Sequence, residues 1–296
     1  MVRCESLTDV VVITLNSQNH LQRCLESVVR EIPHARLIVV DGGSTDRTVE
    51  LAKSHGALVL TQERPGLGEA RRIGLAVAKS PIMAMVDSDI ALPKGWFAQV
   101  NQKLRNDHVV GATGCVISGD PGCRALARYS EWRRTHHEWT AILSNALVKT
   151  ALVHRVGGFN PEYQTSEDVD LLMRVFAAGL TWVMVEDLIV RHPRTFLREL
   201  AHIWWWSSNS PRLVILGPKA AAKYFLGLLS QSFVLARVDF NLIWMWPLRS
   251  IVWMMGYLRR LTSINSKRRA TRHWIERLER GDWIQRLERR EYSHRS

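Results

Sequence analysis

Cysteine is scarce in this chain of 296 residues, and its start lacks the features of a secretory leader. The cysteines show neither C-x-x-C spacing nor a partnering histidine pattern, so we expect free thiols in a reducing compartment. Polar residues run up to Asp9, and no small-residue cleavage site follows an apolar core. Both absences favour a body that folds in the cytoplasm. The cysteines are Cys4, Cys24, Cys115 and Cys123.

Acidic residues are scarce in the last third of the chain. Residues 1–199 hold 23 Lys/Arg and 22 Asp/Glu, whereas residues 200–296 hold 17 and only six, so the net charge of +12 is concentrated there. Six of the twelve tryptophans fall between Trp204 and Trp253. Basic charge beside apolar, Trp-rich sequence favours an anionic membrane surface. Nucleic-acid binding is the alternative, but no reading motif accompanies the charge.

Uninterrupted apolar runs long enough to cross a bilayer easily, about 20 residues, are also absent. Residues 220–236 contain Lys223, residues 240–258 contain Arg249, and three residues separate the two stretches. Although both stretches are short, the tight connection between them leads us to predict a two-helix transmembrane hairpin. Five basic residues between positions 259 and 269 then place both hairpin ends and the body on the cytoplasmic side of the cell membrane. Interfacial amphipathic helices and a soluble helical subdomain are the alternatives.

The first two-thirds of the chain alternates short β-branched runs with amphipathic segments, which predicts an α/β fold with a mostly parallel sheet. Residues 120–149 show no clear pattern, and only helices are expected after residue 195. The predicted strands are residues 10–14, 37–40, 57–60, 82–86, 109–116 and 181–185, and the predicted helices are residues 21–31, 46–56, 68–79, 97–104 and 169–178.

Three regions follow from this pattern. Residues 1–195 form the α/β body, and residues 196–264 form an all-helical, membrane-associated region with an interfacial helix before the hairpin. Residues 265–296 form a basic amphipathic helical tail, in which Trp-Ile-x-Arg-Leu-Glu-Arg occurs twice.

Paired acids end the predicted strand at residues 82–86. Residues i and i+2 of an extended segment point to the same side, so Asp87 and Asp89 of Asp87-Ser88-Asp89 can face one ligand. In α/β folds that position is the crevice where substrates bind. A divalent cation that carries a diphosphate would suit two carboxylates, because Mg²⁺ is usually held by carboxylates and substrate phosphates. A solvated turn is the alternative.

Other segments accompany this pair in a fixed order. They are Thr14-Leu15-Asn16, Asp41 within residues 40–46, residues 66–74 with Arg71, and Gly157-Gly158-Phe159 followed by Ser166-Glu167-Asp168. Over residues 8–195 this series resembles glycosyltransferase family 2, whose members are inverting sugar-nucleotide enzymes with a GT-A fold. The resemblance implies a glycosyltransferase that transfers a hexose.

The resemblance also implies roles for residues on the donor side. Asp41 would accept a hydrogen bond from the nucleobase, with Thr14, Leu15 and Asn16 lining the pocket. Asp87, Asp89 and His192 would hold Mn²⁺ or Mg²⁺, a Lewis acid for the departing diphosphate. The remaining donor contacts are assigned to Arg71, Ser88, Arg191 and Arg194, with Arg72 as the alternative to Arg71 and a structural role as the alternative for His192.

On the acceptor side, Asp168 is the predicted general base. It lies where the helix at residues 169–178 begins, and a helix N-terminus favours an anion. A carboxylate kept ionised there can take the proton of the attacking hydroxyl, and direct displacement with one base inverts the anomeric centre. Glu167 and Trp206 are assigned to the acceptor, and Asp170 is the alternative, a helix-capping acid.

The tail bears on the acceptor. Membrane-associated relatives include prokaryotic polyprenyl- and dolichyl-linked sugar transferases, such as dolichol-phosphate mannose synthase-like and cellulose-synthase-like enzymes. Processive members of the latter group carry Gln-x-x-Arg-Trp after the catalytic domain, and residues 201–211 lack it. We therefore expect a single addition to a polyprenyl or dolichyl phosphate or to a diphosphate-oligosaccharide.

GDP-mannose is the expected donor by resemblance, with UDP-glucose and UDP-N-acetylglucosamine as open alternatives. Two other classes of protein also remain open: a non-catalytic nucleotide-binding membrane scaffold, and a nucleotidyltransferase that releases pyrophosphate. The oligomeric state is not indicated by the sequence.

Overall fold

A computed structural model describes residues 8–118, 124–125, 128–129, 131, 143–192, 195–209, 222, 225–227 and 235–264. The strands are β1 (Thr8–Thr14), β2 (Arg36–Asp41), β3 (Leu58–Thr61), β4 (Ile82–Asp87), β5 (Val109–Ser118), β6 (Asn145–Lys149) and β7 (Thr181–His192). The helices are α1 (Leu21–Glu31), α2 (Thr48–Ser54), α3 (Leu67–Val77), α4 (Trp96–Lys103), α6 (Thr150–Arg155), α7 (Glu167–Ala177), α8 (Phe196–Asn209) and α11 (Leu242–Ile264).

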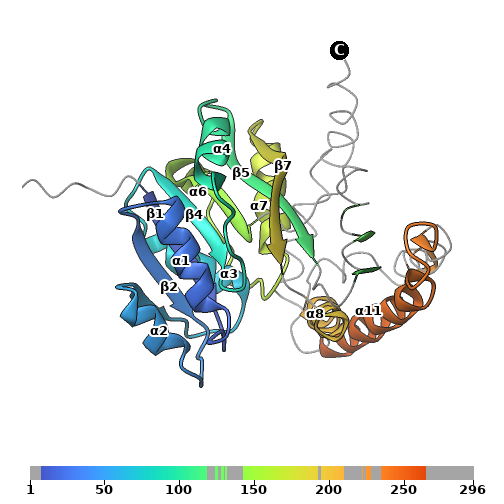
Figure 1. Cartoon of the computed structure of the whole chain (residues 1–296). Coiled ribbons are helices and arrows are strands. Elements are labelled where there is room, and N and C mark those ends of the chain that lie inside the picture. Colours follow the sequence, from blue (N-terminus) through green and yellow to red (C-terminus); the bar gives the residue numbers. More distant parts are fainter. Residues whose placement is uncertain are drawn as a thin grey trace, which may run out of the picture.

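One seven-stranded sheet runs in the order β3-β2-β1-β4-β6-β5-β7 and forms the middle layer of the body (Figure 1). Strands β1 to β4 pair in parallel, and β5 pairs in parallel with β7. Only β6, among the described strands, runs antiparallel to its neighbours. The prediction of a mostly parallel α/β sheet is confirmed.

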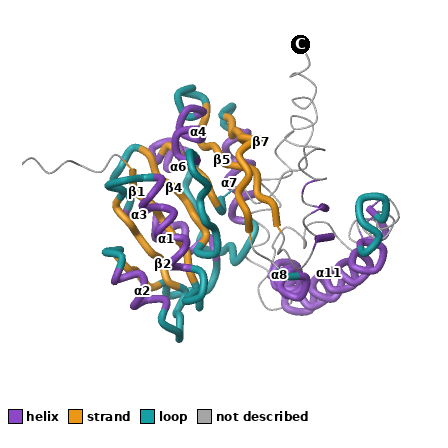
Figure 2. Tube along the Cα trace, viewed as in Figure 1, coloured by secondary structure: helices purple, strands orange, loops and turns teal. Residues whose placement is uncertain are grey.

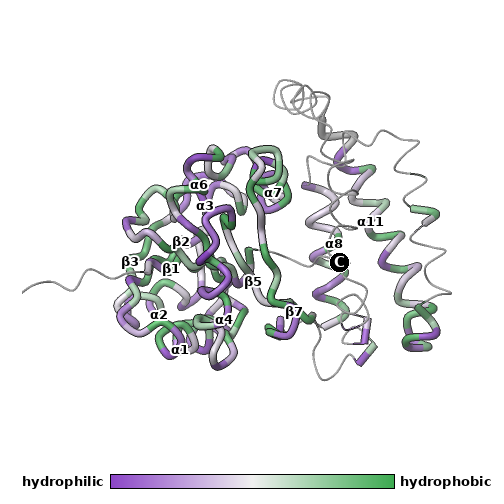
Figure 3. The backbone as a smooth tube through the Cα atoms, turned by 90° about the horizontal axis from the view of Figure 1, so that it is seen from above, coloured by the Kyte–Doolittle hydropathy of each residue, from purple (hydrophilic) through white to green (hydrophobic). Residues whose placement is uncertain are grey.

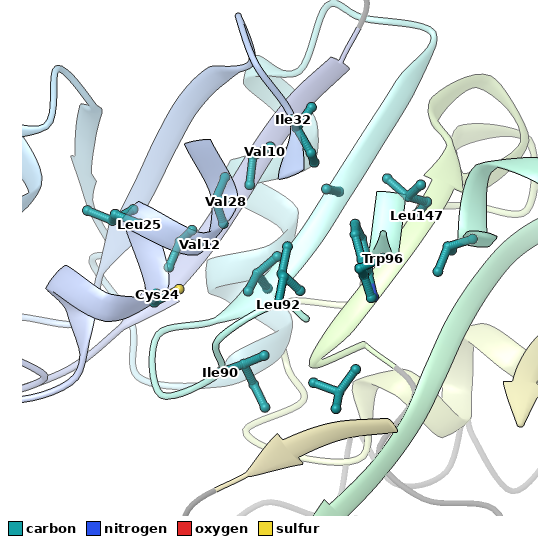
Figure 4. Packing of buried hydrophobic residues seen from close by; sticks show 14 of the residues in the cluster. Val10, Val12, Cys24, Leu25, Val28, Ile32, Ile90, Leu92, Trp96 and Leu147 are labelled. Atoms are coloured by element: carbon teal, nitrogen blue, oxygen red, sulfur yellow. The ribbon is translucent and has the colours of Figure 1, made fainter. Parts of the chain in front are cut away.

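Helices cover both faces of this sheet (Figure 2). Successive strand residues point to opposite faces, so Val10 and Val12 of β1 belong to one core and Val11 and Ile13 to the other. Helices α1, α2 and α4 close the first core, where Trp96 packs with aliphatic side chains (Figure 4). Helices α3, α6 and α7 close the second. Burial on both faces explains why the strands appear in the sequence as continuous apolar runs.

Strand β6 and helix α6 fall outside the sequence prediction, which left residues 120–149 without a pattern. The strand has only three apolar residues, and it begins at Asn145, which is fully buried. The Asn145 carboxamide oxygen accepts hydrogen bonds from Trp96 Nε1 (3.0 Å) and the Gly114 amide (2.9 Å). A buried polar residue satisfied by partners far away in the sequence leaves no local strand signal.

Helices α8 and α11 pack side by side next to the end of β7 (Figure 3). They approach closely at Gly256, where an added Cβ would lie 1.9 Å from Ser207 Oγ. Pro247 stands inside α11, where it removes one backbone donor. No helix within the described residues combines the length and apolar character needed to cross a bilayer.

Several sequence predictions lie outside the described residues. These are Arg194, the tail at residues 265–296, and most of the first apolar stretch at residues 220–236. The second apolar stretch, residues 240–258, falls largely within α11.

Candidate active site

Strand register brings the predicted donor residues to one edge of the sheet. Thr14 pairs with Asp41 across β1 and β2, and Ile13 pairs with Asp87 across β1 and β4. Because the three strands are parallel, their carboxyl ends lie next to one another, where open α/β sheets bind ligands. The loops that follow them therefore build one site from segments that are tens of residues apart in sequence.

The β1 and β2 loops are tied together by their own side chains. Asn16 accepts a hydrogen bond from the Thr45 amide (2.9 Å), and the Asn16 amide donates to Ser44 Oγ (2.8 Å). The buried Asp41 carboxylate accepts from the amides of Gly43 (2.9 Å) and Ser44 (2.8 Å). Asp41 thus shapes the turn after β2.

Two groups beside this turn are suited to a ligand. Thr14 Oγ1 is buried and has no hydrogen-bond partner among the described residues, although buried hydroxyls are normally satisfied. The Leu15 side chain is 58% exposed between two ordered loops. An orphan hydroxyl next to an exposed aliphatic surface can bind a flat heterocycle through one hydrogen bond and one apolar face.

The predicted metal ligands also converge. One ligand atom each of Asp87, Asp89 and His192 lie within 4.8 Å of one another, and His192 Nε2 is 3.2 Å from Asp89 Oδ1. His192 arrives from the end of β7, which continues past the predicted end at residue 185. Two carboxylates and an imidazole form a donor set that fits Mn²⁺ or Mg²⁺.

Ser88, between these acids, holds the loops together. It is buried, its hydroxyl lies 2.8 Å from Ser17 Oγ, and its amide donates to the Ile13 carbonyl (3.3 Å). The Asp87 amide donates to the carbonyl of Ser144, just before β6. Ser17 and Ser144 therefore help to fix the acidic pair, and neither carries a motif signal that sequence reasoning could have used.

Arg71 is buried at the centre of the site. Its guanidinium donates to Glu167 Oε1 (2.9 Å), Asp87 Oδ1 (3.1 Å) and the Leu143 carbonyl (3.3 Å). It thereby bridges an acid of the metal cluster and an acid of the predicted acceptor side. The neighbouring Arg72 is largely engaged by Glu69.

Burial shifts the acids at the start of α7. It raises the pKa of Glu167 to about 7, although the adjacent Arg71 guanidinium favours the ionised form. Burial also raises the pKa of Asp168, opposed by the Val169 amide (2.7 Å) and by Arg71. A carboxylate whose pKa moves toward neutrality is a stronger base while it stays ionised. Asp170, expected from the sequence as a helix-capping acid, instead pairs with Arg174 at 2.6 Å.

The start of α3 holds the loop that carries these acids. The amides of Leu67 and Gly68 donate to the carbonyls of Gln164 (3.1 Å) and Tyr163 (2.9 Å). A Cβ added at Gly68 would lie 2.2 Å from the Asn160 carbonyl oxygen, so the close approach requires glycine. Ser166, which precedes the acids, has a positive φ of 67°.

Two remaining candidates lie farther out. Arg191, on β7, is exposed next to the metal-cluster histidine. Trp206, on α8, is half-buried and packs against the cluster of Ile203, Trp253 and Tyr257.

Comparison with known proteins agrees with this geometry. The profile of glycosyl transferase family 2 matches residues 9–160, slightly more than half of the chain. The chain belongs to glycosyl transferase family 2. It is thus a glycosyltransferase, and the family predicted from the ordered motifs is confirmed.

Several relatives of this family 2 enzyme share most of its length. An uncharacterised glycosyltransferase of Mycobacterium bovis is 31% identical over 201 residues, covering 63% of this chain and 87% of the relative. The pre-mycofactocin glycosyltransferase of Mycobacterium tuberculosis is 25% identical over 232 residues, covering 72% and 48%.

A solved structure supports the fold. The mannosyltransferase PcManGT from Pyrobaculum calidifontis, solved with GDP-mannose and Mn²⁺, superposes with a TM-score of 0.56 at 17% identity. The match covers 91% of this chain and 83% of that protein. The α/β body therefore has the GT-A fold of nucleotide-sugar enzymes.

Proposed function

We propose that this family 2 enzyme is an inverting, metal-dependent mannosyltransferase that adds one sugar from GDP-mannose to a lipid-linked acceptor at the cell membrane. One observation carries the catalytic part: Arg71 joins the cluster of Asp87, Asp89 and His192 to the Glu167–Asp168 pair. The two groups of acids are thereby held on either side of one reaction centre.

The donor side fits a cation and a nucleotide. Asp87, Asp89 and His192 would hold Mn²⁺ or Mg²⁺, which when bound supplies Lewis-acid stabilisation to the diphosphate leaving group. Thr14, Leu15 and Asp41 line the edge where the base would lie. Arg191 and Arg194 remain assigned to the phosphates by resemblance only.

Asp168 is the general base. Its carboxylate takes the proton of the acceptor hydroxyl, the hydroxyl oxygen bonds to the anomeric carbon, and the bond from that carbon to the diphosphate oxygen breaks with its electron pair. Attack opposite the leaving group inverts the anomeric centre. Arg71 and Glu167 do not take part in bond making. Arg71 binds Asp87 and also Glu167, the neighbour of Asp168 in the chain, and so holds the two groups of acids in place.

Support for the donor and acceptor is narrower. The structural match bound to GDP-mannose favours that donor. The basic, Trp-rich last third favours an acceptor held at an anionic membrane, with the catalytic body on the cytoplasmic side. Trp206 and Glu167 are the candidate acceptor contacts.

Asp168→Asn tests the proposal, since it keeps the size of the side chain and removes the base. We expect transfer to fall by about 10²–10⁴-fold, the usual contribution of a general base, while nucleoside diphosphates and Mn²⁺ still raise the melting temperature. The matched control is Asp170→Asn on the same helix, which should lower stability and spare transfer. Transfer retained by Asp168→Asn would contradict the assignment.

The same melting assay identifies the donor class. GDP and UDP are compared with Mn²⁺ present, and the larger rise in melting temperature marks the base that the pocket prefers. A larger shift with UDP would replace GDP-mannose by a UDP-sugar and leave the catalytic assignment unchanged.

A further inference from the structure

Helix α11 presents an apolar stripe that stays about half exposed among the described residues, although Trp244 at its start also contacts Phe196 of α8. Five side chains are between 39% and 53% exposed and recur at intervals of three or four residues along one face: Trp244, Leu248, Ile251, Met255 and Leu258. At 1.5 Å per residue the stripe is about 21 Å long. Phe240, just before the helix, is 75% exposed and extends it by one turn.

The opposite face of α11 is already used. Leu242, Met245 and Trp246 are buried in one apolar cluster, and Trp253 and Tyr257 in another that includes Ile203 of α8. Helix α11 lies beyond α8 as seen from the sheet (Figure 3). The stripe is thus a second apolar face of this helix, and exposed apolar patches of this kind mark interaction sites.

Charge indicates the occupant. Helix α11 contains no Asp or Glu; of its three arginines, Arg249 pairs with Glu199 of α8 and Arg259 is exposed, and the last third of the chain carries most of the net positive charge. A second copy of this chain would bring two strongly basic surfaces together, which like-charge repulsion opposes. Anionic lipid head groups complement that charge, and the Trp244 ring at the start of the stripe suits the bilayer interface.

We infer that α11 lies in the plane of an anionic bilayer and inserts this stripe among the head groups. No described helix is long and apolar enough to span a bilayer, whereas an amphipathic helix with one apolar face and nearby arginines lies along its surface. The inference rests on the proposed function in one respect, namely that the acceptor is a membrane lipid.

The placement also orients the site. Helix α8 begins four residues after His192 of the metal cluster, and α8 is joined to α11 by Glu199–Arg249 (3.6 Å) and by the edge-to-face rings of Phe196 and Trp244. A bilayer that contacts α11 is therefore connected to the reacting centre through α8 alone. An acceptor whose phosphate stays at the head-group level could reach the site without leaving the membrane.

Vesicle flotation of the full-length protein tests the inference. We compare phosphatidylcholine vesicles with vesicles in which about a third of the lipid is phosphatidylglycerol. The wild type should float with the anionic vesicles and much less with the neutral ones, and added salt should weaken the binding. The triple variant Ile251→Ser, Met255→Ser, Leu258→Ser should bind anionic vesicles about tenfold more weakly or worse.

The matched control replaces two exposed apolar residues of the body, Val29→Ser and Leu58→Ser, which should leave flotation unchanged. Melting temperature checks the fold of each variant. If the triple variant melts early, the single variant Met255→Ser is used, with about threefold weaker binding expected.

Three results would overturn the inference: equal flotation of the stripe variants, no preference of the wild type for anionic vesicles, or a wild-type dimer in sedimentation that the triple variant abolishes. Transfer to a water-soluble acceptor separates this outcome from the proposed function. If the wild type transfers sugar but does not float, only the membrane inference is contradicted. If it floats but transfers no sugar, only the proposed function is contradicted.

Discussion

Replacing Arg71 by methionine should disconnect the two acid groups of the site. The guanidinium is only 3% exposed and is the described link between Glu167 and Asp87. Removing one partner of a buried ion pair costs about 3–5 kcal/mol, because a buried charge is left unpaired. We expect a loss near the lower end of that range, because Asp87 is 28% exposed and water can replace its lost partner.

The loss should depend on pH, and its sign follows from Glu167. The pKa of this carboxyl is raised to about 7 by burial even with Arg71 beside it, so it rises further when the guanidinium is gone. A carboxyl with a raised folded pKa destabilises the protein as pH climbs from its unfolded pKa to its folded one. Wild type completes this loss near pH 7, and the variant continues to lose stability above it. The deficit of Arg71→Met therefore grows as pH rises above about 7.

Urea unfolding at about pH 6 and about pH 8.5 measures this difference for Arg71→Met, Glu167→Gln and the double variant. Glutamine is neutral, so removing Arg71 beside it leaves no buried charge unpaired. The loss of unfolding free energy in the double variant should therefore be smaller than the sum of the two single losses, by about 0.5–3 kcal/mol. Arg72→Met is the control. It removes a neighbouring arginine whose side chain is 43% exposed, and its buried partner Glu69 keeps Arg64 at 3.8 Å, so the loss should be smaller than that of Arg71→Met.

Transfer should fall about 10²-fold in Arg71→Met, the scale of a misplacement of about 1 Å among reacting groups. Binding of the nucleoside diphosphate should change little, because Arg71 is engaged by protein groups. Additive unfolding energies for Arg71 and Glu167, together with a nucleotide affinity that falls as far as the rate, would refute the bridge. The nucleotide contact expected from the family resemblance would then stand in its place.

Three further substitutions test other parts of the site and, at Asp9, the opposite end of the sheet. Gly68→Ala should cost about 1–3 kcal/mol and lower transfer, because its Cβ would collide with the Asn160 carbonyl oxygen; an unchanged melting temperature would contradict the close packing. His192→Ala should raise the Mn²⁺ concentration for half-maximal transfer by about 10- to 100-fold, and an unchanged titration would remove His192 from the metal set. Burial alone would raise the pKa of Asp9, but Arg36 and two backbone amides more than offset it, so the pKa is lowered and the stabilisation is lost as pH falls below about 4. Asp9→Asn should lower the free energy of unfolding by about 3 kcal/mol at neutral pH, and its stability should depend less on pH in acid than that of the wild type. A loss that persists unchanged at low pH would contradict this.

Much of the donor side could be predicted from sequence because it depends on strand ends. Apolar runs that stop at Thr14, Asp41 and Asp87 place these residues at the carboxyl ends of strands. Parallel pairing of the strands then brings the three residues to the same edge of the sheet. The prediction needed no knowledge of register, since neighbouring parallel strands deliver their ends to the same edge.

Strand β7 shows where that reasoning stops. The sequence predicted its end at residue 185, just before the charged Glu186 and Asp187, which are exposed in the structure. The structure accommodates them in an irregularity of the β5–β7 pairing, where Gly114 pairs with Val185 but the next residue pairs with Ile189. A bulge keeps the strand in the sheet while it turns charged residues outward, and so lets it reach His192.

Helix α3 shows a different limit, because its residues act through contacts that no local pattern encodes. Gly68 is required by the Asn160 carbonyl, and Gly74 by Val11, whose Cγ1 would lie 2.3 Å from an added Cβ. Arg71 lies between them on the same helix and binds two acids that are distant in sequence, one at the end of β4 and one at the start of α7. The two glycines press α3 against both the sheet and the acceptor-side loop, so the guanidinium cannot shift toward one acid without breaking its contact with the other. The distance between the metal acids and the general base is therefore set by how α3 packs, and a substitution that moves this helix should impair catalysis even where every catalytic side chain is intact.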